Sequence, residues 1–324
     1  IDLSIEWFPF DRPGLMAEAV QTINPSVMIL LETELWPGLI HCLKENQTRI
    51  IIANARLSRK SYKTYSLTRW LWSCLSPDRI LATSDQDARH YKDLFPEARV
   101  SRMSNIKFEI LSQNPADAET VNALKNILAP VLHLTILASV RKQEEHLMIK
   151  GIIRLLRACP EQTIAVFPRH MHRINAWKKQ LEAFHIDYTL RSDLNSHPPG
   201  KQVLLWDRFG ELKSAYAFAR AVFVGGSLTP LGGQNFIEPA IHGAPTVIGP
   251  YYDDFAWAGD QIFEREIVFK EKNLDRVLAR VIRLIQTPLD RAVQAEKCRE
   301  YLLANQGGAG QVCDAVEKSL RRNA

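Results

Sequence analysis

Short apolar runs alternate with longer amphipathic stretches along the chain. The runs are rich in Ile, Leu and Val and are bounded by turn or capping residues, the pattern of buried parallel strands. These predicted strands are Ser26–Leu31, Arg49–Ala53, Arg79–Ala82, His133–Ala138, Thr163–Phe167, Gln202–Leu205, Ala221–Val224 and Pro245–Ile248. Helical periodicity separates them, for example over Pro37–Lys44 and Ser58–Leu75. A first strand is predicted near Leu3–Phe8, and the chain after Asn273 is predicted to be mainly helical.

Repeated strand–helix–strand units predict an α/β fold with parallel sheets that helices cover on both faces. The polar stretch Ser112–Thr120, which contains Asn114-Pro115, separates two series of such units. We therefore predict two Rossmann-like domains facing a cleft, the N-terminal one incomplete, with ligands at the carboxyl ends of the strands. The predicted parts are an N-terminal domain (1–112), a linker (113–128) with helix Val121–Leu128, a C-terminal domain (129–305) and a C-terminal helix (306–324) that packs back toward the N-terminal domain.

Composition supports a folded protein of two domains. The 324 residues exceed what one hydrophobic core usually supports, and 46% of them are hydrophobic and 24% charged. The 41 basic and 36 acidic residues leave a net charge of +5, which favours anionic partners. Nucleic acid would require a dense basic stripe interleaved with aromatic residues. The basic residues are scattered instead, so no nucleic-acid partner is expected.

Several classes of protein are disfavoured by absent sequence features. The five cysteines are odd in number and form no CxxC pair, which indicates reduced thiols rather than a disulfide or zinc framework. The chain contains no GxSxG, Walker or HExxH motif, which disfavours hydrolases, P-loop NTPases and zincins. It also has no signal peptide or apolar run long enough to span a bilayer. Because the chain begins with Ile1, we expect any leader or membrane anchor to precede it.

The densest candidate site follows the predicted strand Ala221–Val224. Gly225, Gly226 and Ser227 end the strand, and Gly232 and Gly233 precede a helix predicted to begin near Asn235. Glycines let backbone amides approach a ligand, and a helix N-terminus favours a phosphate.

Two side chains beside these glycines have open roles. Asn235 could cap the predicted helix or contact the phosphate, and Glu238 could accept both hydroxyls of a ribose or complement the helix dipole. A tight strand-to-helix turn is the alternative interpretation of the whole segment. The concentration of Gly, Ser, Asn and Glu favours a nucleotide site.

A second candidate site follows the predicted strand Thr163–Phe167. Arg169 and Arg173 are four residues apart and would share a helix face if a helix began there, so together they could bind a phosphate. His170 and His172 could bind a metal, but they lack a nearby third ligand, so no metal site is expected. A solvated basic turn remains the simplest alternative.

Further candidates lie in the N-terminal half. Glu32 and Glu34 follow a predicted strand and could orient a substrate or act as acid or base, or this segment could simply begin the next helix. Arg56 follows the next strand and could bind an anion, while Ser58 is predicted to be an N-cap. Two weaker segments could each close a loop at the site or form an ordinary turn: Ser104–Phe108, which contains Lys107, and Gly210-Glu211.

In order, these segments resemble the 3-deoxy-D-manno-octulosonic acid (Kdo) transferases of lipopolysaccharide synthesis. The matching runs cover nearly the whole chain: Glu32-Thr-Glu-Leu-Trp-Pro37, Asn54-Ala-Arg-Leu-Ser58, Asn105-Ile-Lys-Phe108, Pro168-Arg-His-x-x-Arg173, Gly210-Glu-Leu212 with Tyr216, Val224-Gly-Gly-Ser227, Gly232-Gly-x-Asn-x-x-Glu-Pro239, and Gly249-Pro250 with Phe255.

The resemblance implies a GT-B glycosyltransferase that moves Kdo from CMP-Kdo to a lipid A precursor, with inversion and without a metal or other cofactor. It implies the cytoplasmic face of the bacterial inner membrane, reached through a region before Ile1. The implied acceptor-side residues are Glu32, Glu34, Arg56 and Lys107. The implied donor-binding residues are Ser139, Arg169, His170, Arg173, Gly210, Glu211, Gly225, Gly226, Ser227, Gly232, Gly233, Asn235 and Glu238.

Three departures from the family pattern bear on this expectation. The family's Ser-Thr-His-x-Gly-Glu-Glu run reads Ser139-Val-Arg-Lys-Gln-Glu-Glu145 here, so Val140, Arg141 and Gln143 differ. Gln234 replaces the His of the family's Gly-Gly-His-Asn run. The family's catalytic base is a Glu in a glycine-containing loop that the order of motifs places before Ile1. We therefore expect no catalytic base within these residues, and no transfer by them alone.

Two alternatives remain open from the sequence. The first is a divergent or non-catalytic GT-B paralogue that binds another nucleotide sugar. The second is a sugar-nucleotide epimerase of similar fold, which would prefer UDP to CMP.

Overall fold

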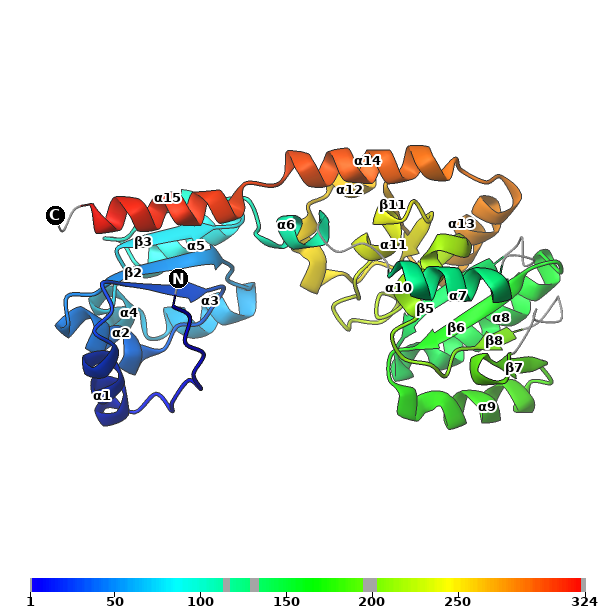
Figure 1. Cartoon of the computed structure of the whole chain (residues 1–324), viewed down its shortest axis with the longest axis horizontal. Coiled ribbons are helices and arrows are strands. Elements are labelled where there is room, and N and C mark those ends of the chain that lie inside the picture. Colours follow the sequence, from blue (N-terminus) through cyan, green and yellow to red (C-terminus); the bar gives the residue numbers. More distant parts are fainter. Residues whose placement is uncertain (1, 113–116, 129–133, 195–202, 322–324) are drawn as a thin grey trace. The chain divides into compact units, whose positions relative to one another are not determined.

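A computed structural model describes residues 2–112, 117–128, 134–194 and 203–321 of the chain. These residues form two compact units (Figure 1). Unit 1 comprises Ile1–Ile110 and Asn305–Ala324, and unit 2 comprises Leu111–Ala304. Each unit has its own parallel sheet.

Unit 1 contains a four-stranded parallel sheet in the order β1-β2-β3-β4. Its strands are β1 (Val27–Leu31), β2 (Arg49–Ala55), β3 (Arg79–Ala82) and β4 (Arg99–Arg102). Its helices are α1 (Pro13–Ile23), α2 (Pro37–Glu45), α3 (Arg59–Ser66), α4 (Arg69–Cys74), α5 (Asp85–Leu94), α6 (Lys107–Ser112, which reaches into the start of unit 2) and α15 (Gly308–Leu320).

Helices cover both faces of the unit 1 sheet because its strands carry apolar residues on both sides. Ile50 and Ile52 of β2 join a buried cluster with Ile40 of α2 and Phe95 after α5. On the opposite face, Ile51 packs in a smaller cluster with residues of α15. The two ends of the chain therefore meet in one unit, with α15 against β1 and β2.

Unit 2 contains a seven-stranded parallel sheet in the order β11-β10-β9-β5-β6-β8-β7. Its strands are β5 (Leu134–Val140), β6 (Thr163–Pro168), β7 (Tyr188–Leu190), β8 (Val203–Leu205), β9 (Ala219–Val224), β10 (Thr246–Ile248) and β11 (Val268–Lys270). Its α-helices are α7 (Ala118–Leu128), α8 (Glu145–Ala158), α9 (Ile174–Ala183), α10 (Leu212–Ala215), α11 (Ile237–Ile241), α12 (Gln261–Glu264), α13 (Leu274–Gln286) and α14 (Arg291–Ala304). Its 3₁₀ helices are η1 (Lys142–Glu144), η2 (Met171–Arg173), η3 (Arg191–Asp193), η4 (Tyr216–Phe218) and η5 (Asp253–Ala258).

Three helices share one apolar core with the unit 2 sheet. Residues of α8, α9 and α13 pack in a single buried cluster with side chains of β5, β6 and β9. Four of the remaining helices form two further pairs, α7 with α10 and α11 with α14, and α12 packs against β11. Helix α7 contains Val121–Leu128, predicted above as part of a linker, and this contact joins it to unit 2.

The strands predicted from Ser26 onward are present, so the α/β prediction with parallel sheets is confirmed. His133, Gln202 and Asn114-Pro115 lie outside the described residues. Three short strands were not predicted: β4, β7 and β11. Each has only three or four residues and too few apolar positions to form a recognisable run.

Two predictions about the N-terminal elements are wrong. Leu3–Phe8 forms no strand, and Leu3, Ile5 and Trp7 are exposed. Alternating apolar residues become a strand only when a neighbouring strand completes the hydrogen-bond ladder. The edge strand β1 pairs only with β2 among the described strands. The predicted helix Ser58–Leu75 is two helices, α3 and α4, which are separated by Leu67 and Thr68.

Candidate functional site

The unit 2 sheet has a topological switch point between β5 and β9. After β5 the chain proceeds through β6, β7 and β8 on one side, and then returns to place β9, β10 and β11 on the other. Ligands of such sheets bind at the carboxyl ends of the two strands where the order reverses. Here the segments at those ends are Ser139–Glu145, of which Ser139 was a predicted donor-binding residue, and Gly225–Ser227, all three of which were predicted.

The segment after β9 packs against the end of β5 at Gly225. A Cβ atom at Gly225 would lie 2.8 Å from both the carbonyl oxygen of Ser139 and the Cα of Val140. Both are backbone atoms that cannot easily move, so only glycine fits. Gly226 follows with φ of +71°, a conformation that L residues rarely adopt.

Glu144 holds this glycine segment in place. Its carboxylate is fully buried; Oε2 accepts the amide of Gly226 at 2.5 Å and Oε1 accepts the amide of Leu228 at 2.7 Å. The interaction spans the switch point, because η1 follows β5 and the glycine segment follows β9. Sequence reasoning assigned Glu144 no role.

Ser227, a predicted donor-binding residue, is buried and bonded within the protein. Its Oγ donates to the carbonyl of Val224 at 2.6 Å and accepts the amide of Gly249 at 2.9 Å. Ser227 therefore joins the end of β9 to the segment after β10.

The second glycine pair folds back onto the first. Gly232 and Gly233 both have positive φ, and the amide of Gly233 donates to the carbonyl of Gly226 at 2.9 Å. The amide of Gly225 likewise donates to the carbonyl of Ala138. The expectation that these glycines offer their amides to a phosphate therefore fails for Gly225, Gly226 and Gly233, whose amides already donate to Ala138, Glu144 and Gly226.

Asn235 caps the short helix α11, one of the two roles considered for it. Its Oδ1 accepts the amides of Ile237 at 3.2 Å and Glu238 at 3.3 Å. These bonds tie the start of α11, which carries Glu238, to the segment after the glycine loop.

Glu238 lies half-buried in α11 beside other titratable groups. Burial raises the pKa of its carboxyl, and the nearby charge of Lys213 partly opposes that shift. Burial also lowers the pKa of His242, with Lys213 and Arg291 adding to the effect. A partly desolvated carboxylate at this position is suited to accept hydroxyl groups of a ligand.

Cationic and imidazole groups gather at the carboxyl ends of β5 and β6. The rings of His170 and His172 stack with centroids 5.5 Å apart. Burial and the charges of Arg169, His172 and Arg141 lower the pKa of His170. The Nε of Arg141 is buried and has no hydrogen-bond partner among the described residues. Arg141 was noted only as a departure from the family pattern, and its place directly after β5 was the signal that could have identified it as a site residue.

Arg173 does not join the group formed by Arg141, Arg169, His170 and His172, because its guanidinium forms an ion pair with Glu145. Its Nε and Nη2 donate to the two oxygens of Glu145 at 2.8 and 2.6 Å, and Gln180 also donates to Glu145. The idea that Arg169 and Arg173 share a helix face is wrong, because the first helical residue is Met171 and Arg169 precedes it. Arg169 instead continues from β6, with its amide bonded to the carbonyl of Val140.

Glu211 is likewise held inside the protein. Its carboxylate pairs with the buried Arg191, with Nε and Oε2 3.0 Å apart, and accepts the indole N–H of Trp206 at 3.0 Å. The neighbouring Gly210 is exposed and has φ of +89°. Glu211 therefore fixes the base of this loop, and Gly210 permits its turn.

In unit 1 the predicted residues gather at the carboxyl ends of β1 and β2. The Nζ of Lys107 lies 2.6 Å from Oε1 of Glu32, which itself has φ of +57°. Glu34 accepts the indole N–H of Trp36 at 2.8 Å. Arg56 makes no side-chain hydrogen bond or ion pair within the part of the chain that the structure describes.

Buried residues beneath this group were missed by sequence reasoning. The Tyr91 hydroxyl lies 3.1 Å from the carbonyl oxygens of both Glu32 and Arg56, shares its single hydrogen between them, and thereby joins the two strand ends. Asn54 and Asn105 are buried, and neither Nδ2 has a partner among the described residues. The motifs containing both asparagines were recognised, but which side chains point inward depends on the tertiary structure.

The prediction that Ser58 is an N-cap is confirmed. Its Oγ accepts the amide of Ser61 at 3.1 Å and caps α3.

Across the described ranges, no three His, Cys, Asp or Glu side chains are arranged to hold a metal ion. The helices within those ranges are all too short or too polar to cross a bilayer.

Comparison with solved structures identifies the type of fold. The chain is 12% identical to a glycosyltransferase from Rickettsia africae, with a TM-score of 0.59 over 98% of this chain and 83% of that one. It is 11% identical to a putative UDP-N-acetylglucosamine 2-epimerase from Listeria monocytogenes, with a TM-score of 0.58 over 96% of this chain and 78% of that one. These likenesses show the fold, which is of the GT-B type.

The chain is also similar to proteins of higher sequence identity. Residues 2–110 match the family described as 3-deoxy-D-manno-octulosonic-acid transferase (kdotransferase). The Kdo transferase of Haemophilus influenzae is 28% identical over 98% of this chain and 75% of its own length. That of Bordetella pertussis is 29% identical over 97% of this chain and 74% of its own length.

A solved structure extends the likeness. The C-terminal CMP-Kdo binding domain of WaaA from Acinetobacter baumannii is 25% identical, with a TM-score of 0.53 over 57% of this chain and 99% of that domain. The chain is thus related to the Kdo transferases along almost its whole length, as its motifs predicted.

Proposed function

We propose that the protein transfers Kdo from CMP-Kdo to a lipid A precursor, with unit 2 holding the donor. The observation that carries the proposal is the group of cations and imidazoles at the carboxyl ends of β5 and β6, in a chain similar to a CMP-Kdo binding domain. CMP-Kdo carries a phosphate and a carboxylate, two anions that such a group can bind.

Arg169 is the principal donor-binding residue in this proposal, joined by Arg141 and His170. Arg169 is exposed at the carboxyl end of β6, and Arg141 occupies the equivalent place after β5. These groups would stabilise the negative charge that develops on the departing CMP phosphate. Arg173 contributes through its pairing with Glu145, which orients the turn that presents Arg169 and His170.

Glu238 completes the donor site by accepting the ribose hydroxyls of the nucleotide. A carboxylate can accept two neighbouring hydroxyls at once. Asn235 orients Glu238 by capping α11, and Gln234, where the family has His, is the position at which we expect donor preference to differ.

We assign the acceptor side to unit 1. Glu32, Lys107, Glu34 and Arg56 combine carboxylates and cations that could bind the hydroxyls and phosphates of a lipid A precursor. The reaction we propose is inverting: an acceptor oxygen loses its proton to a base and attacks the anomeric carbon as the bond to CMP breaks. We expect it to need no metal and to occur at the cytoplasmic face of the inner membrane.

Nucleotide titration calorimetry tests the donor assignment. The protein should bind CMP more tightly than UDP, and Arg169→Ala should weaken CMP binding by about tenfold or more, the value of a charge-assisted hydrogen bond. Arg157→Ala, an exposed arginine at the end of α8, is the matched control and should bind as wild type. Binding of UDP without CMP would sink the proposal in favour of an epimerase-like binder.

A further inference from the structure

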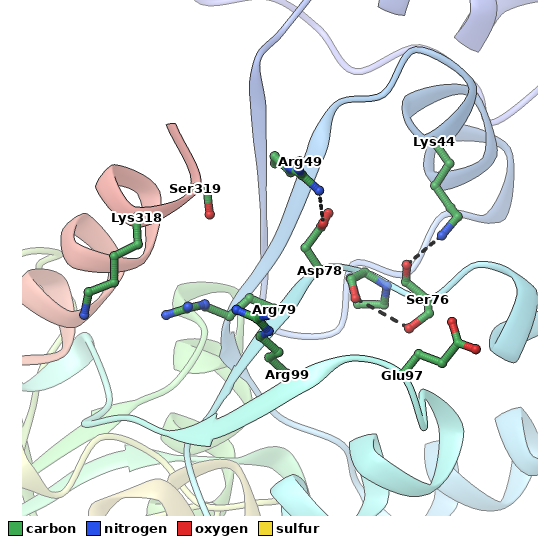
Figure 2. Close-up of a pocket in the computed structure, with 10 residues that line it drawn as sticks. Lys44, Arg49, Ser76, Asp78, Arg79, Glu97, Arg99, Lys318 and Ser319 are labelled. Atoms are coloured by element: carbon green, nitrogen blue, oxygen red, sulfur yellow. Dashed lines mark hydrogen bonds and ion pairs between the residues drawn. The ribbon is translucent and has the colours of Figure 1, made fainter. Parts of the chain in front are cut away.

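A cavity of about 330 Å³ opens at the amino-terminal edge of the unit 1 sheet (Figure 2). Three of its residues begin strands: Arg49 in β2, Arg79 in β3 and Arg99 in β4. Glu32 and Arg56 lie at the carboxyl ends, so this cavity is separate from the proposed acceptor side. Its full lining is Lys44, Arg49, Ser76, Pro77, Asp78, Arg79, Glu97, Arg99, Lys318 and Ser319.

Two of the five cations in the lining already have partners. Nη1 of Arg49 pairs with Oδ1 of Asp78 at 2.8 Å, and the other oxygen of Asp78 accepts the amide of Ile50. Lys44 donates to the carbonyl of Ser76 at 3.0 Å. Glu97 lies on the side of Ser76 and Lys44, away from Lys318 (Figure 2).

The other three cations, Arg79, Arg99 and Lys318, have no hydrogen bond or ion pair from their side chains to any described residue. Arg79 and Arg99 are direct partners in the register of β3 and β4, so their side chains leave the same face of the sheet. Lys318 extends from α15 toward the same space (Figure 2). Like charges placed side by side on neighbouring strands destabilise a sheet unless an anion separates them.

We propose that this cavity binds a phosphomonoester. Guanidinium groups bind phosphate oxygens through paired N–H donors, and a dianion matches three convergent cations better than a carboxylate does. One water occupies roughly 30 Å³ of liquid, so the cavity also has room for a small organic group attached to the phosphate. The ligand could be a soluble phosphorylated compound or the headgroup of a lipid, which present the same chemistry.

Binding to two probes tests the site. Glycerol 3-phosphate is titrated calorimetrically into the full chain, and vesicles of phosphatidylcholine with phosphatidic acid are sedimented with it. Arg99→Gln and Lys318→Gln should each weaken binding about tenfold or more, since each removes a charge-assisted contact. Arg102→Gln is the matched control, because Arg102 lies on the same strand, pairs with Asp85 and does not line the cavity.

Thermal unfolding separates loss of binding from loss of folding. Without the probe, Arg99→Gln should unfold at the same temperature as wild type or higher, because it relieves repulsion between Arg79 and Arg99. Glycerol 3-phosphate should then raise the unfolding temperature of wild type and of Arg102→Gln, but not that of Arg99→Gln. If vesicle binding depends on Arg99 and glycerol 3-phosphate binds only weakly, the phosphomonoester that the cavity binds is a lipid headgroup, which the proposal includes.

Two outcomes would overturn the proposal. One is the absence of saturable binding to either probe by wild type. The other is equal binding by Arg99→Gln, Lys318→Gln and Arg102→Gln.

Discussion

The carboxylate of Glu144 accepts the amide of Gly226 at 2.5 Å across 82 residues of sequence. This contact joins the segments that follow β5 and β9, the two strands at the switch point of the unit 2 sheet. The position of the glycine loop, and of the polar residues that follow it, therefore depends on a buried acid whose two oxygens both accept backbone amides of that loop.

Glu144→Gln should destabilise unit 2 and weaken CMP binding. An amide can accept only one of the two backbone N–H groups with its oxygen, and its own N–H₂ faces the other, which leaves a buried donor unpaired. The expected cost is about 1–3 kcal/mol in the free energy of unfolding, measured with denaturant. Glu161→Gln, at an exposed residue of the same unit, should have no comparable effect. Equal stability of the two variants would contradict the role assigned to Glu144.

Gly225→Ala should be among the most damaging small substitutions in the chain. The added methyl group would meet backbone atoms of Ser139 and Val140 at 2.8 Å, which forces the two strand ends apart. Gly14→Ala provides the opposite control, because the methyl group that alanine adds at this position of α1 would have no neighbour within 4 Å. There we expect unchanged or slightly higher thermal stability, since alanine favours a helix more than glycine does. If both variants unfold at the wild-type temperature, the close packing at Gly225 is not needed.

Arg173→Ala should reduce stability more than it reduces CMP affinity. It leaves the Glu145 carboxylate, whose side chain is only 4% exposed, without its bidentate partner. Removing one member of a fully buried pair typically costs about 3–5 kcal/mol. We expect a smaller loss here, because the Arg173 side chain is 21% exposed and Gln180 still donates to Glu145. The double variant Arg173→Ala with Glu145→Ala should recover part of that loss, and unfolding of all four proteins measures the coupling. Additive effects would show that the two residues do not act as a pair.

Binding of CMP should tighten as the pH falls from about 8 to about 7, a range in which the CMP phosphate stays mostly dianionic. The folded-state pKa of His170 is lowered, so folding favours its neutral form. Any stability that this contributes is present above the unfolded pKa of about 6.5 and is lost as the pH falls from there through the lower folded pKa. A bound phosphate acts in the opposite direction and raises the pKa of His170, so binding takes up a proton. Calorimetry at both pH values, with NMR titration of the imidazole, measures this linkage.

The histidine control separates this site from general effects of pH. His170→Asn should lose the pH dependence, whereas His185→Asn should keep it. His185 is exposed and has φ of +52°, a conformation that asparagine tolerates well. A pH dependence that persists in His170→Asn would assign the proton uptake to another group.

Local patterns predicted most of the fold because burial on both faces of a parallel sheet requires continuous apolar strands. The runs before Glu32, Arg56 and Arg169 were recognised for this reason, and the positions of those residues at the carboxyl ends followed. Strand β4 was missed because Arg99–Arg102 contains a single apolar residue, Val100. Its place in the sheet comes from pairing with β3, which no local pattern encodes.

The sequence by itself determined the α/β class, the order of most strands along the chain and the segments from which a site could be built. Only the tertiary structure decided which of those polar groups remain available to a ligand. Ser227, Glu211 and Arg173 were predicted to bind the donor, yet each is bonded to a partner inside its own unit. The physical reason is that a buried polar group must be paired, and partners such as Glu144 and Gly226 become neighbours only when distant strands meet in the sheet.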